Sequence, residues 1–300
     1  MHHISKQTSK FLTMRNINAL AGNGNASFNS PDRVGGYIRG FKAFKTASGN
    51  DEVLARAISE VCNPELGETV LDIGTADGSL VAQMVGRSAS VTYFEPLPEL
   101  YRAAYENLSA ACSSVEGFND NFTPDVDLGS RQYSLILLSH VLYHVPYQTW
   151  TQFFSVLRKI LAPSGTIVAT LWSKQSEAFS FAQELTPDRP LPAADHLLEL
   201  ATTQDFMKKA GCELVGKRDV TVRIQAKPSH EANAVLCFLS GRCFKAIAQN
   251  PRQHARARWR IQQGLNNHQT IMTFKPSLAK DTCERRGGGW MDRRWRRSPK

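Results

Sequence analysis

The segment from Thr69 to Leu80 constrains the fold of this chain more than any other stretch. It reads TVLDIGTADGSL. The apolar residues at its start predict a short buried β-strand, and the small residues after them predict a tight turn that leads into a helix. In α/β proteins this arrangement brings backbone N–H groups and a helix amino end to a ligand at the carboxyl ends of the strands. An ordinary βα turn has the same outline, so other residues must separate the two interpretations.

Two acidic residues favour the ligand-binding interpretation. Asp72 lies inside the end of the predicted strand, where a carboxylate is costly to bury unless it meets a cation or several hydrogen-bond donors. Glu95 ends the next apolar run, Val91 to Phe94, and an acid at that point can accept hydrogen bonds from both hydroxyls of a ribose. Together they favour a ligand that carries a ribose and a positive charge.

A nicotinamide dinucleotide is the main alternative ligand. Its fingerprint spaces glycines as G-x-G-x-x-G, whereas Gly74 and Gly78 stand here in a G-x-A-x-G pattern, with Ser79 in the place of the last glycine. Asp72 would also repel a pyrophosphate. The strand, the acid, the small-residue turn and the second acid resemble the class I S-adenosylmethionine-dependent methyltransferases, whose cofactor has an ammonium group and a ribose. The departure is Ala76, which replaces the middle glycine of that family's motif.

The distribution of charge bears on a nucleic-acid partner. Of the net charge of +9, residues 1–46 contribute seven basic side chains against one acidic, and 276–300 contribute eight against three. The body between them, 47–275, therefore has a net charge of −2. That body does not favour a polyanionic partner, and no Asn-Pro-Pro-aromatic motif follows the fourth predicted strand. We expect a small-molecule substrate rather than a nucleic acid, and the sequence assigns no oligomeric state.

The six cysteines are scattered, with no CxxC pair and no histidines at zinc spacing. They predict reduced thiols in an intracellular, cytoplasmic protein without a metal site. No apolar run is long enough to span a membrane.

Apolar runs and amphipathic segments alternate from Thr69 onward, which predicts a parallel sheet with helices on both faces. The predicted strands are Val70–Ile73, Val91–Glu95, Ser114–Phe118, Tyr133–Leu138, Thr166–Leu171, Glu213–Gln225 and Thr270–Phe274. The predicted helices are Gly35–Thr46, Glu52–Val61, Leu80–Val85, Glu99–Ala111, Trp150–Leu161 and Thr202–Ala210, with a helical stretch from His230 to Gly264. We expect a turn at Pro163-Ser164-Gly165 and a loop or small insertion over Lys174–Asp195.

The domain organisation follows from this pattern. Residues 31–275 are expected to form one methyltransferase domain, with a helical insertion over about 229–264 that caps the substrate pocket. Residues 1–30 predict a flexible tail, and 276–300 a disordered basic tail. The expected fold class is α/β, Rossmann-like and of the class I methyltransferase type, with a seven-stranded, mostly parallel sheet.

The loop after the fourth predicted strand holds the residues most suited to proton transfer. It reads SHVLYHVP from Ser139 to Pro146, so that His140, Tyr143 and His144 stand close together. Either imidazole could accept a proton near neutral pH. The alternative is that His140 is a hydrogen-bonded core residue and His144 a surface residue.

Three runs, RVGGYIRGFKAF, SHVLYHV and GLNNHQTIMTF, resemble histamine N-methyltransferase and its relatives in order and spacing. The resemblance implies that Gly74 and Glu95 bind the cofactor and that Ser139 flanks its adenosyl group. It also implies a set of residues that line the substrate pocket, namely Tyr37, Phe41, His140, Tyr143, His144 and Asn267. The family glutamate that binds the substrate amine matches Asn50 here, and a family glutamine and tyrosine are replaced by His140 and His144. These departures argue against histamine as the substrate and leave a neutral or acidic acceptor as open as an amine.

The expected function is methyl transfer to a small molecule, with nitrogen ahead of oxygen as the acceptor atom. The expected cofactor-binding residues are Asp72, Gly74, Thr75, Gly78, Glu95, Asp120, Asn121 and Ser139, of which Asp120 or Asn121 would reach the adenine. The expected catalytic residues are His140, His144 and Tyr143. Two alternatives stay open, an O-methyltransferase of specialised metabolism and a cofactor-binding protein that has lost transfer and serves as a scaffold.

Overall fold

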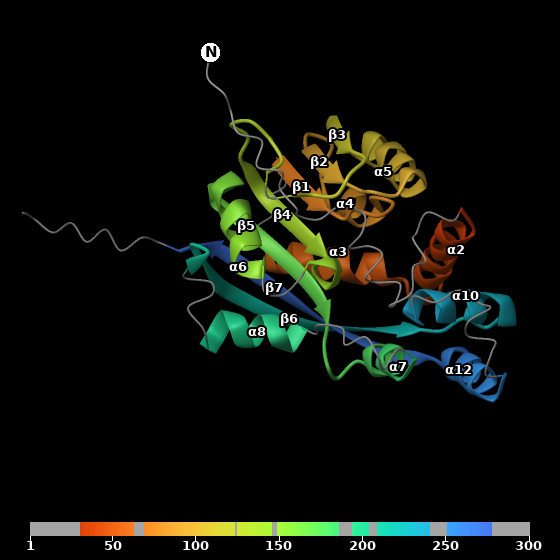
Figure 1. Ribbon diagram of the computed structural model, residues 1–300. Coiled ribbons are helices and arrows are strands. Elements are labelled where there is room, and N and C mark those ends of the chain that lie inside the picture. The colour runs from red at the N-terminus through yellow and green to blue at the C-terminus, as the bar shows by residue number, and fades with distance from the viewer. Residues whose placement is uncertain are drawn as a thin grey trace, which may run out of the picture.

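Seven strands form one mixed sheet in the order β3-β2-β1-β4-β5-β7-β6 (Figure 1). They are β1 (Thr69–Ile73), β2 (Ser90–Phe94), β3 (Ser114–Phe118), β4 (Tyr133–Ser139), β5 (Leu161–Trp172), β6 (Cys212–Ile224) and β7 (Leu265–Pro276). Neighbours from β3 to β5 pair in parallel, whereas β7 is antiparallel to both β5 and β6. The predicted Rossmann-like fold with a mostly parallel sheet is confirmed.

The computed structural model describes residues 31–62, 69–123, 125–145, 149–185, 194–203, 209–240 and 251–277. The predicted tail 1–30 and the part of the predicted C-terminal tail beyond residue 277 lie outside the described residues. Within the described residues, no helix has the length and apolar character needed to cross a membrane.

Helices cover both faces of the sheet. They are α2 (Pro31–Ser48), α3 (Asn50–Val61), α4 (Ser79–Met84), α5 (Pro98–Ala111), α6 (Trp150–Ile160), α7 (Glu177–Leu185), α8 (Ala194–Thr203), α10 (Ser229–Ser240) and α12 (Pro251–Gln263), with a short 3-10 turn at Leu142–His144. Successive strand residues point to opposite faces. Val70 therefore packs with α3, α4 and α5, whereas Leu71 packs with α6 and α8.

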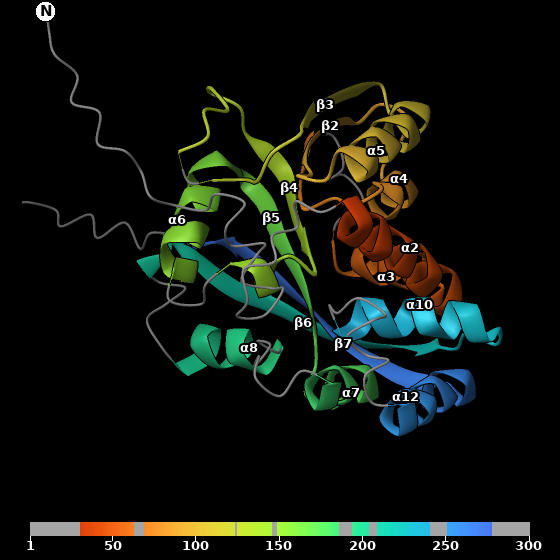
Figure 2. The same cartoon turned by 45° about the vertical axis from the view of Figure 1, so that its right-hand side comes forward.

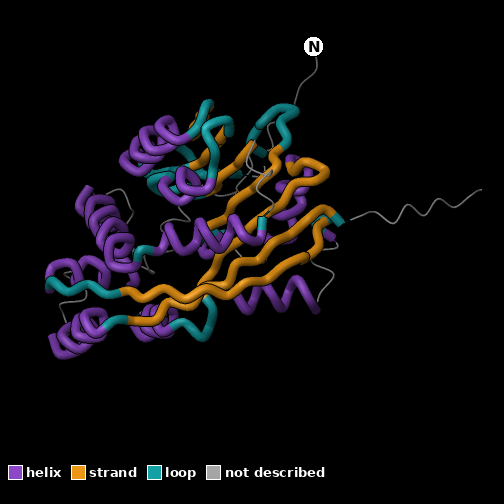
Figure 3. The backbone as a smooth tube through the Cα atoms, turned by 180° about the vertical axis from the view of Figure 1, so that it is seen from behind, coloured by secondary structure: helices purple, strands orange, loops and turns teal. Residues whose placement is uncertain are grey.

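A separate core joins α2, α7, α10 and α12 at one end of the sheet (Figure 2). Trp172 at the end of β5 packs there with Phe44 of α2 and Leu236 of α10. Seen from behind, long strands of the sheet run on into this group of helices (Figure 3). A Cβ atom on Gly40 of α2 would lie 2.9 Å from the carbonyl oxygen of Ala234 in α10, so the two helices cross at close range.

The prediction of a loop over Lys174–Asp195 was wrong in part, because this segment contains α7 and the start of α8. Ala178, Phe181 and Ala182 are buried on one face of α7. A short helix can form here because it packs on the sheet. Its helical spacing of apolar residues is hard to recognise in the sequence, since proline and charged residues follow it directly. The predicted helix Thr202–Ala210 overlaps the end of α8, and its residues 204–208 lie outside the described part.

Two strands also differ from the prediction. The predicted turn at Pro163-Ser164-Gly165 lies inside β5, where the pairing with β4 shifts register between Tyr133–Leu161 and Leu135–Thr166, as at a β-bulge. The last strand begins at Leu265 rather than Thr270, because its first residues pair with the end of β6. Asn267 therefore lies within a strand.

Candidate active site

The turn after β1 has a backbone that only small residues accept easily. Gly74 and Gly78 have φ values of +73° and +72°, and Ala76 between them has +54°. A Cβ atom on Gly74 would stand 2.8 Å from the Cγ2 atom of Val141. Glycine at position 74 is thus required by both conformation and space. Ala76 occupies a left-handed conformation at some cost, which explains why a glycine suits the middle of such a turn.

Asp72 is buried at the end of β1 and only half paired. The hydroxyl group of Thr75 donates to its Oδ2 atom, whereas its buried Oδ1 atom has no hydrogen-bond partner among the described residues. Burial raises the pKa of Asp72 to about 7, against the hydrogen bond from Thr75 and with the help of the negative charge on Asp51. Such a carboxylate is suited to receive a cationic group from a ligand.

Glu95 follows β2 directly and lies beside the same turn, because β1 and β2 are parallel neighbours. Its Oε2 atom accepts the backbone N–H of Ala76 at 3.0 Å, and its Oε1 atom accepts that of Leu97 at 2.8 Å. Burial raises the pKa of Glu95 to about 7; the two N–H groups oppose this shift, and the charges of Asp72 and Asp77 add to it. Two buried carboxylates of high pKa thus flank the glycine turn.

The predicted adenine-binding residues lie after β3, at the same edge of the sheet. Asp120 is exposed, and its Oδ1 atom accepts the backbone N–H of Asn121 at 2.7 Å. Their neighbour Asn119 donates its side-chain amide to the carbonyl oxygen of Glu95 at 2.8 Å. The structure therefore brings this loop next to Glu95. The hydrogen bond that joins the loop to Glu95 comes from Asn119 and not from Asp120 or Asn121.

Lys45 of α2 fastens this helix to the glycine turn. Its Nζ atom lies 2.6 Å from Asp51 Oδ2 and 2.6 Å from Asp77 Oδ1, and it also contacts the hydroxyl group of Ser79. Burial acts to raise the pKa of Asp77, but the hydrogen bonds and charge of Lys45, with further hydrogen bonds from Ser79, hold it below its usual value. We call this cluster of Lys45, Asp51, Asp77 and Ser79 the α2 latch. No sequence pattern predicts this cluster, because Lys45 and Asp51 are far in the chain from Asp77 and Ser79.

Replacing Lys45 with methionine should lower the free energy of unfolding by about 1–3 kcal/mol, because two partly buried carboxylates would lose their cation. Urea denaturation measures the change. The matched control is Arg56→Met, since Arg56 pairs with Glu52 on an exposed helix surface at 3.5 Å and should change stability by no more than about 0.5 kcal/mol. Equal effects of the two substitutions would contradict a stabilising latch.

His140, at the end of β4, belongs to a chain of hydrogen bonds. The backbone N–H of Trp172 donates to the phenol oxygen of Tyr143, which lies 3.2 Å from His140 Nδ1. His140 Nε2 lies 2.8 Å from Gln269 Oε1, and the amide nitrogen of Gln269 donates to Asn50 Oδ1. The phenol hydrogen has His140 Nδ1 as its one acceptor among the described residues, so the imidazole is neutral and carries its proton on Nε2.

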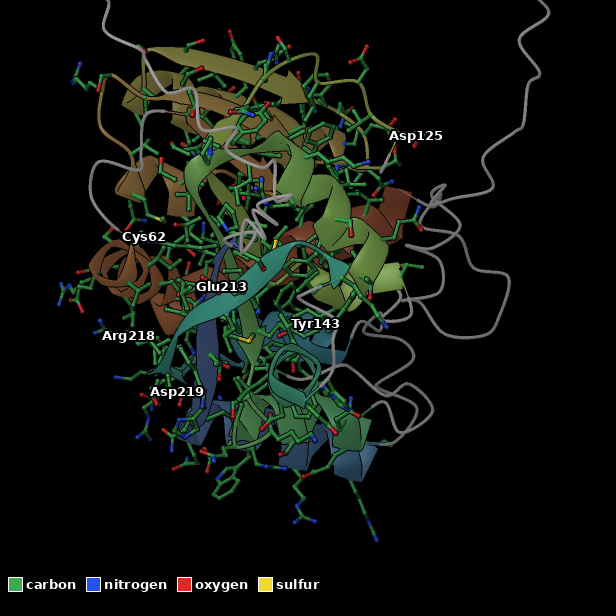
Figure 4. The ribbon with its side chains drawn as sticks, turned by 90° about the vertical axis from the view of Figure 1, so that its left-hand side faces the viewer. Cys62, Asp125, Tyr143, Glu213, Arg218 and Asp219 are labelled. Atoms are coloured by element: carbon green, nitrogen blue, oxygen red, sulfur yellow. The ribbon has the colours of Figure 1, made fainter. Side chains whose placement is uncertain are left out.

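This chain of hydrogen bonds offers no side chain that is ready to take a proton from a substrate. Burial lowers the pKa of His140 although the contact with Gln269 and the charge of Asp51 act in the opposite direction. Burial raises the pKa of Tyr143 above its usual value, against the hydrogen bond from Trp172. His144 is exposed in the 3-10 turn. In the side-chain view, Tyr143 lies near the centre of the picture, away from Arg218 and Asp219 of β6 at the left edge of the molecule (Figure 4).

The predicted substrate residues fall into two groups. Tyr37 and Phe41 of α2 pack against Phe238 of α10, with ring centroids 5.5 and 5.9 Å apart. Burial and then the charge of Glu95 raise the pKa of Tyr37 above its usual value. Asn267 lies in β7, buried, and accepts a hydrogen bond from Ser176 at 3.2 Å.

Two further observations complete the site. The hydroxyl of Ser139, the predicted neighbour of the adenosyl group, accepts a hydrogen bond from that of Thr170 at 3.0 Å. Gln269 and Trp172 were not among the predicted site residues, and β7 and β5 bring them to the site. Gln269 lies within the run GLNNHQTIMTF that supports the resemblance, which could have identified it. Among the described residues, no group of three or more His, Cys, Asp or Glu side chains could hold a metal ion.

Comparison with known proteins identifies the family. A family model described as a methyltransferase domain matches residues 47–249. No curated protein matches the chain. Among solved structures, the chain is similar to 1,6-didemethyltoxoflavin-N1-methyltransferase of Burkholderia thailandensis, solved with 1,6-didemethyltoxoflavin and S-adenosylhomocysteine. The identity is 15% and the TM-score 0.49, with 92% of this chain and 98% of that chain covered.

A TehB-like methyltransferase of Corynebacterium glutamicum is also similar, at 16% identity and a TM-score of 0.43, with 63% of this chain and 88% of that chain covered. The family model spans more than half of the 300 residues. The chain therefore belongs to the methyltransferase-domain family, and it is a class I methyltransferase that uses S-adenosyl-L-methionine as its cofactor.

Proposed function

We propose that this protein transfers a methyl group from S-adenosylmethionine to a nitrogen atom of a small molecule. The observation that carries the proposal is the α2 latch, in which Lys45 Nζ of α2 lies 2.6 Å from Asp77 Oδ1 in the glycine turn. Because Lys45 ties α2 to the turn and α2 packs on α10, we expect an acceptor to approach the cofactor beside these helices. A small molecule suits such a covered site, and a folded macromolecule does not. The closer resemblance to the histamine N-methyltransferase subfamily stays a prediction.

The residues of the glycine turn fit the cofactor. The unpaired Oδ1 atom of Asp72 would accept from the ammonium group of the methionine moiety, and Glu95 from the ribose hydroxyls. Gly74, Thr75 and Gly78 would bring the turn close to the ligand, while Asp120, Asn121 and Ser139 stay the predicted contacts of the adenosyl part. When bound, the cofactor supplies a methyl group on a sulfonium centre that is already activated for transfer.

Nitrogen is favoured over oxygen by the state of the two groups nearest the predicted acceptor. His140 has both ring nitrogens engaged, at 3.2 Å to Tyr143 and 2.8 Å to Gln269, and the phenol of Tyr143 is itself an acceptor of the Trp172 N–H. An alcohol must lose a proton to react well, whereas a neutral nitrogen already has a lone pair. We propose that His140 and Tyr143 position the acceptor and that His144 is the remaining candidate for a base.

The test is to incubate the protein with S-adenosylmethionine carrying a ¹³C-labelled methyl group and a metabolite extract. Mass spectrometry should then reveal a small product that is heavier by one labelled methyl group, and the ¹³C chemical shift of this group should be that of an N-methyl carbon. An O-methyl shift would contradict the choice of nitrogen. Binding of S-adenosylhomocysteine without any labelled product would contradict transfer itself.

The raised pKa values of Asp72 and Glu95 predict how cofactor affinity depends on pH. An ammonium group requires the ionised form of Asp72, and this carboxyl takes up a proton as the pH falls below about 7. By linkage, the affinity for S-adenosylhomocysteine should fall by up to about tenfold per pH unit below that value. Calorimetry at pH 8 and pH 6 measures this change.

The stability of the free protein should move in the opposite direction over the same range. Because the folded-state pKa values of both carboxyl groups lie above their unfolded values, the penalty for burying their charge is fully present above about pH 7. It is lost as the pH falls toward their unfolded values, so acidification from pH 8 to pH 6 should raise their contribution to stability. If neither the affinity for S-adenosylhomocysteine nor the free energy of unfolding changed between pH 8 and pH 6, the raised pKa values of Asp72 and Glu95 would be contradicted.

A further inference from the structure

The ends of β5 and β7 present several buried polar side chains on one face of the sheet. Trp172 of β5 is paired with Gln269 of β7, and cross-strand partners point to the same face. Asn267 lies two residues from Gln269 and shares that face. Trp172 is 9% exposed, and both amide side chains are fully buried. We call Trp172, Asn267 and Gln269, with His140 and Tyr143 next to them, the acceptor wall.

The hydrogen-bond acceptors of this wall already have donors. The phenol oxygen of Tyr143 accepts from the backbone of Trp172, and His140 Nδ1 accepts from that phenol. Gln269 Oε1 accepts from His140 Nε2 at 2.8 Å, and Asn267 Oδ1 accepts from Ser176 at 3.2 Å. The wall therefore offers little to a ligand that needs to donate.

Two donors of the same wall have no partner among the described residues. These are the indole N–H of Trp172 and the amide group of Asn267, whose nitrogen atoms are buried. Buried donors are nearly always paired in folded proteins, because an unpaired one loses its hydrogen bonds to water without replacement. Two unpaired donors on one face of adjacent strands indicate an absent partner that supplies hydrogen-bond acceptors.

The distance to the cofactor turn suits a small molecule. Neighbouring strands are about 4.8 Å apart, so β5 lies roughly 10 Å from β1 with β4 between them. The ring of Trp172 lies 6.0 Å from that of His140 and 5.6 Å from that of Tyr143, so the wall is also aromatic. A molecule of one or two rings could reach from the wall to a methyl group above β1.

We propose that Trp172 and Asn267 determine specificity for the methyl acceptor, by donating hydrogen bonds to an oxygen or an unprotonated ring nitrogen of that molecule. This rests on the proposed function and deepens it. The acceptor then carries a carbonyl, carboxylate or similar group at the end that faces β5 and β7. An ammonium group is disfavoured there, because each hydrogen-bond acceptor of the wall already has a donor among the described residues, whereas the two unpaired groups are donors.

Three probes of one ring size test the proposal on the full chain saturated with S-adenosylhomocysteine. Benzamide presents a neutral hydrogen-bond acceptor, benzoate presents an anionic hydrogen-bond acceptor, and benzylamine presents an ammonium group that can only donate. The indole ¹H–¹⁵N signal of Trp172, assigned as the signal lost in Trp172→Phe, should move on titration with benzamide or benzoate and not with benzylamine. Trp172→Phe should weaken binding of the effective probe by about tenfold.

Trp259→Phe is the matched control, because Trp259 is 59% exposed on α12 and should leave probe binding unchanged. The proposal is overturned if benzylamine binds as tightly as the other two probes, if no probe moves the Trp172 signal, or if Trp172→Phe binds the probes like the unaltered protein. The last result would mean that water satisfies the two donors.

Failure here is distinguishable from failure of the proposed function. Methyl transfer with unaltered probe binding in Trp172→Phe would remove only the role of the wall. Selective probe binding without methyl transfer to any metabolite would remove the proposed function and leave the binding preference in place.

Discussion

Asp72→Asn should weaken S-adenosylhomocysteine binding by about 30- to 100-fold, because a buried charge-assisted hydrogen bond to the ligand ammonium is replaced by a neutral contact. The structure supplies the reason. One oxygen of Asp72 is held by Thr75, and the other is buried without a partner among the described residues. Isothermal titration calorimetry at pH 8, where the carboxyl group is ionised, measures the loss.

The same substitution should not destabilise the free protein. At pH 8 the buried carboxylate is a penalty, since its pKa is raised to about 7, and the amide of asparagine removes this charge. We expect the free energy of unfolding to rise by about 1–3 kcal/mol. Glu213→Gln, at an exposed position of β6 (Figure 4), makes the same change in net charge and should alter neither quantity. A destabilised Asp72→Asn with unchanged affinity would mean that Asp72 serves the fold and not the ligand.

Gly74→Ala should lower the free energy of unfolding by about 2–4 kcal/mol and impair cofactor binding. Alanine at a φ of +73° costs about 1–2 kcal/mol, and its Cβ atom would stand 2.8 Å from Val141 Cγ2. Valine is branched at Cβ and cannot swing away freely, so the turn itself must move. Thermal and urea unfolding measure the stability, and calorimetry measures the affinity.

Gly129→Ala separates conformation from crowding. Gly129 has a similar φ of +64°, but a Cβ atom there would meet nothing within 4 Å. It should cost only about 1 kcal/mol and leave cofactor affinity unchanged. If the two alanine variants lose the same stability and bind S-adenosylhomocysteine equally, the contact with Val141 has no role.

The parts of this protein that the sequence could predict are local. The alternation of apolar runs and turns identified the parallel strands, because each strand is a continuous stretch of the chain. The acids and glycines around Asp72 and Glu95 predict that the turn after β1 binds the cofactor, and the structure brings these residues together because they follow neighbouring parallel strands. The short helix α7 could not be predicted, since its stability comes from packing on the sheet. Its apolar residues do follow a helical period, but the helix is short and is followed by proline and charged residues.

The contacts that shape the acceptor side are long-range. Lys45 and Asp77 are separated by 32 residues, His140 and Gln269 by 129, and Gln269 and Asn50 by 219. No spacing rule connects such pairs. The two contacts of Gln269 depend on the antiparallel position of β7 beside β5, and the contact of Lys45 depends on how α2 packs beside the turn after β1. The imidazole of His140 could therefore be predicted as a base from its position, while its two partners became visible only in three dimensions.

The position of α2 has a consequence for turnover. The ammonium group of Lys45 is shared between Asp51 and Asp77, and the lack of a side chain at Gly40 lets α2 pack closely against α10. Withdrawing α2 would leave the partly buried carboxylates of Asp51 and Asp77 without their shared cation, and it would separate the rings of Tyr37 and Phe41 from Phe238 of α10. If exchange of the cofactor requires α2 to move away from the turn, the cost of breaking these contacts adds to the barrier of each catalytic cycle.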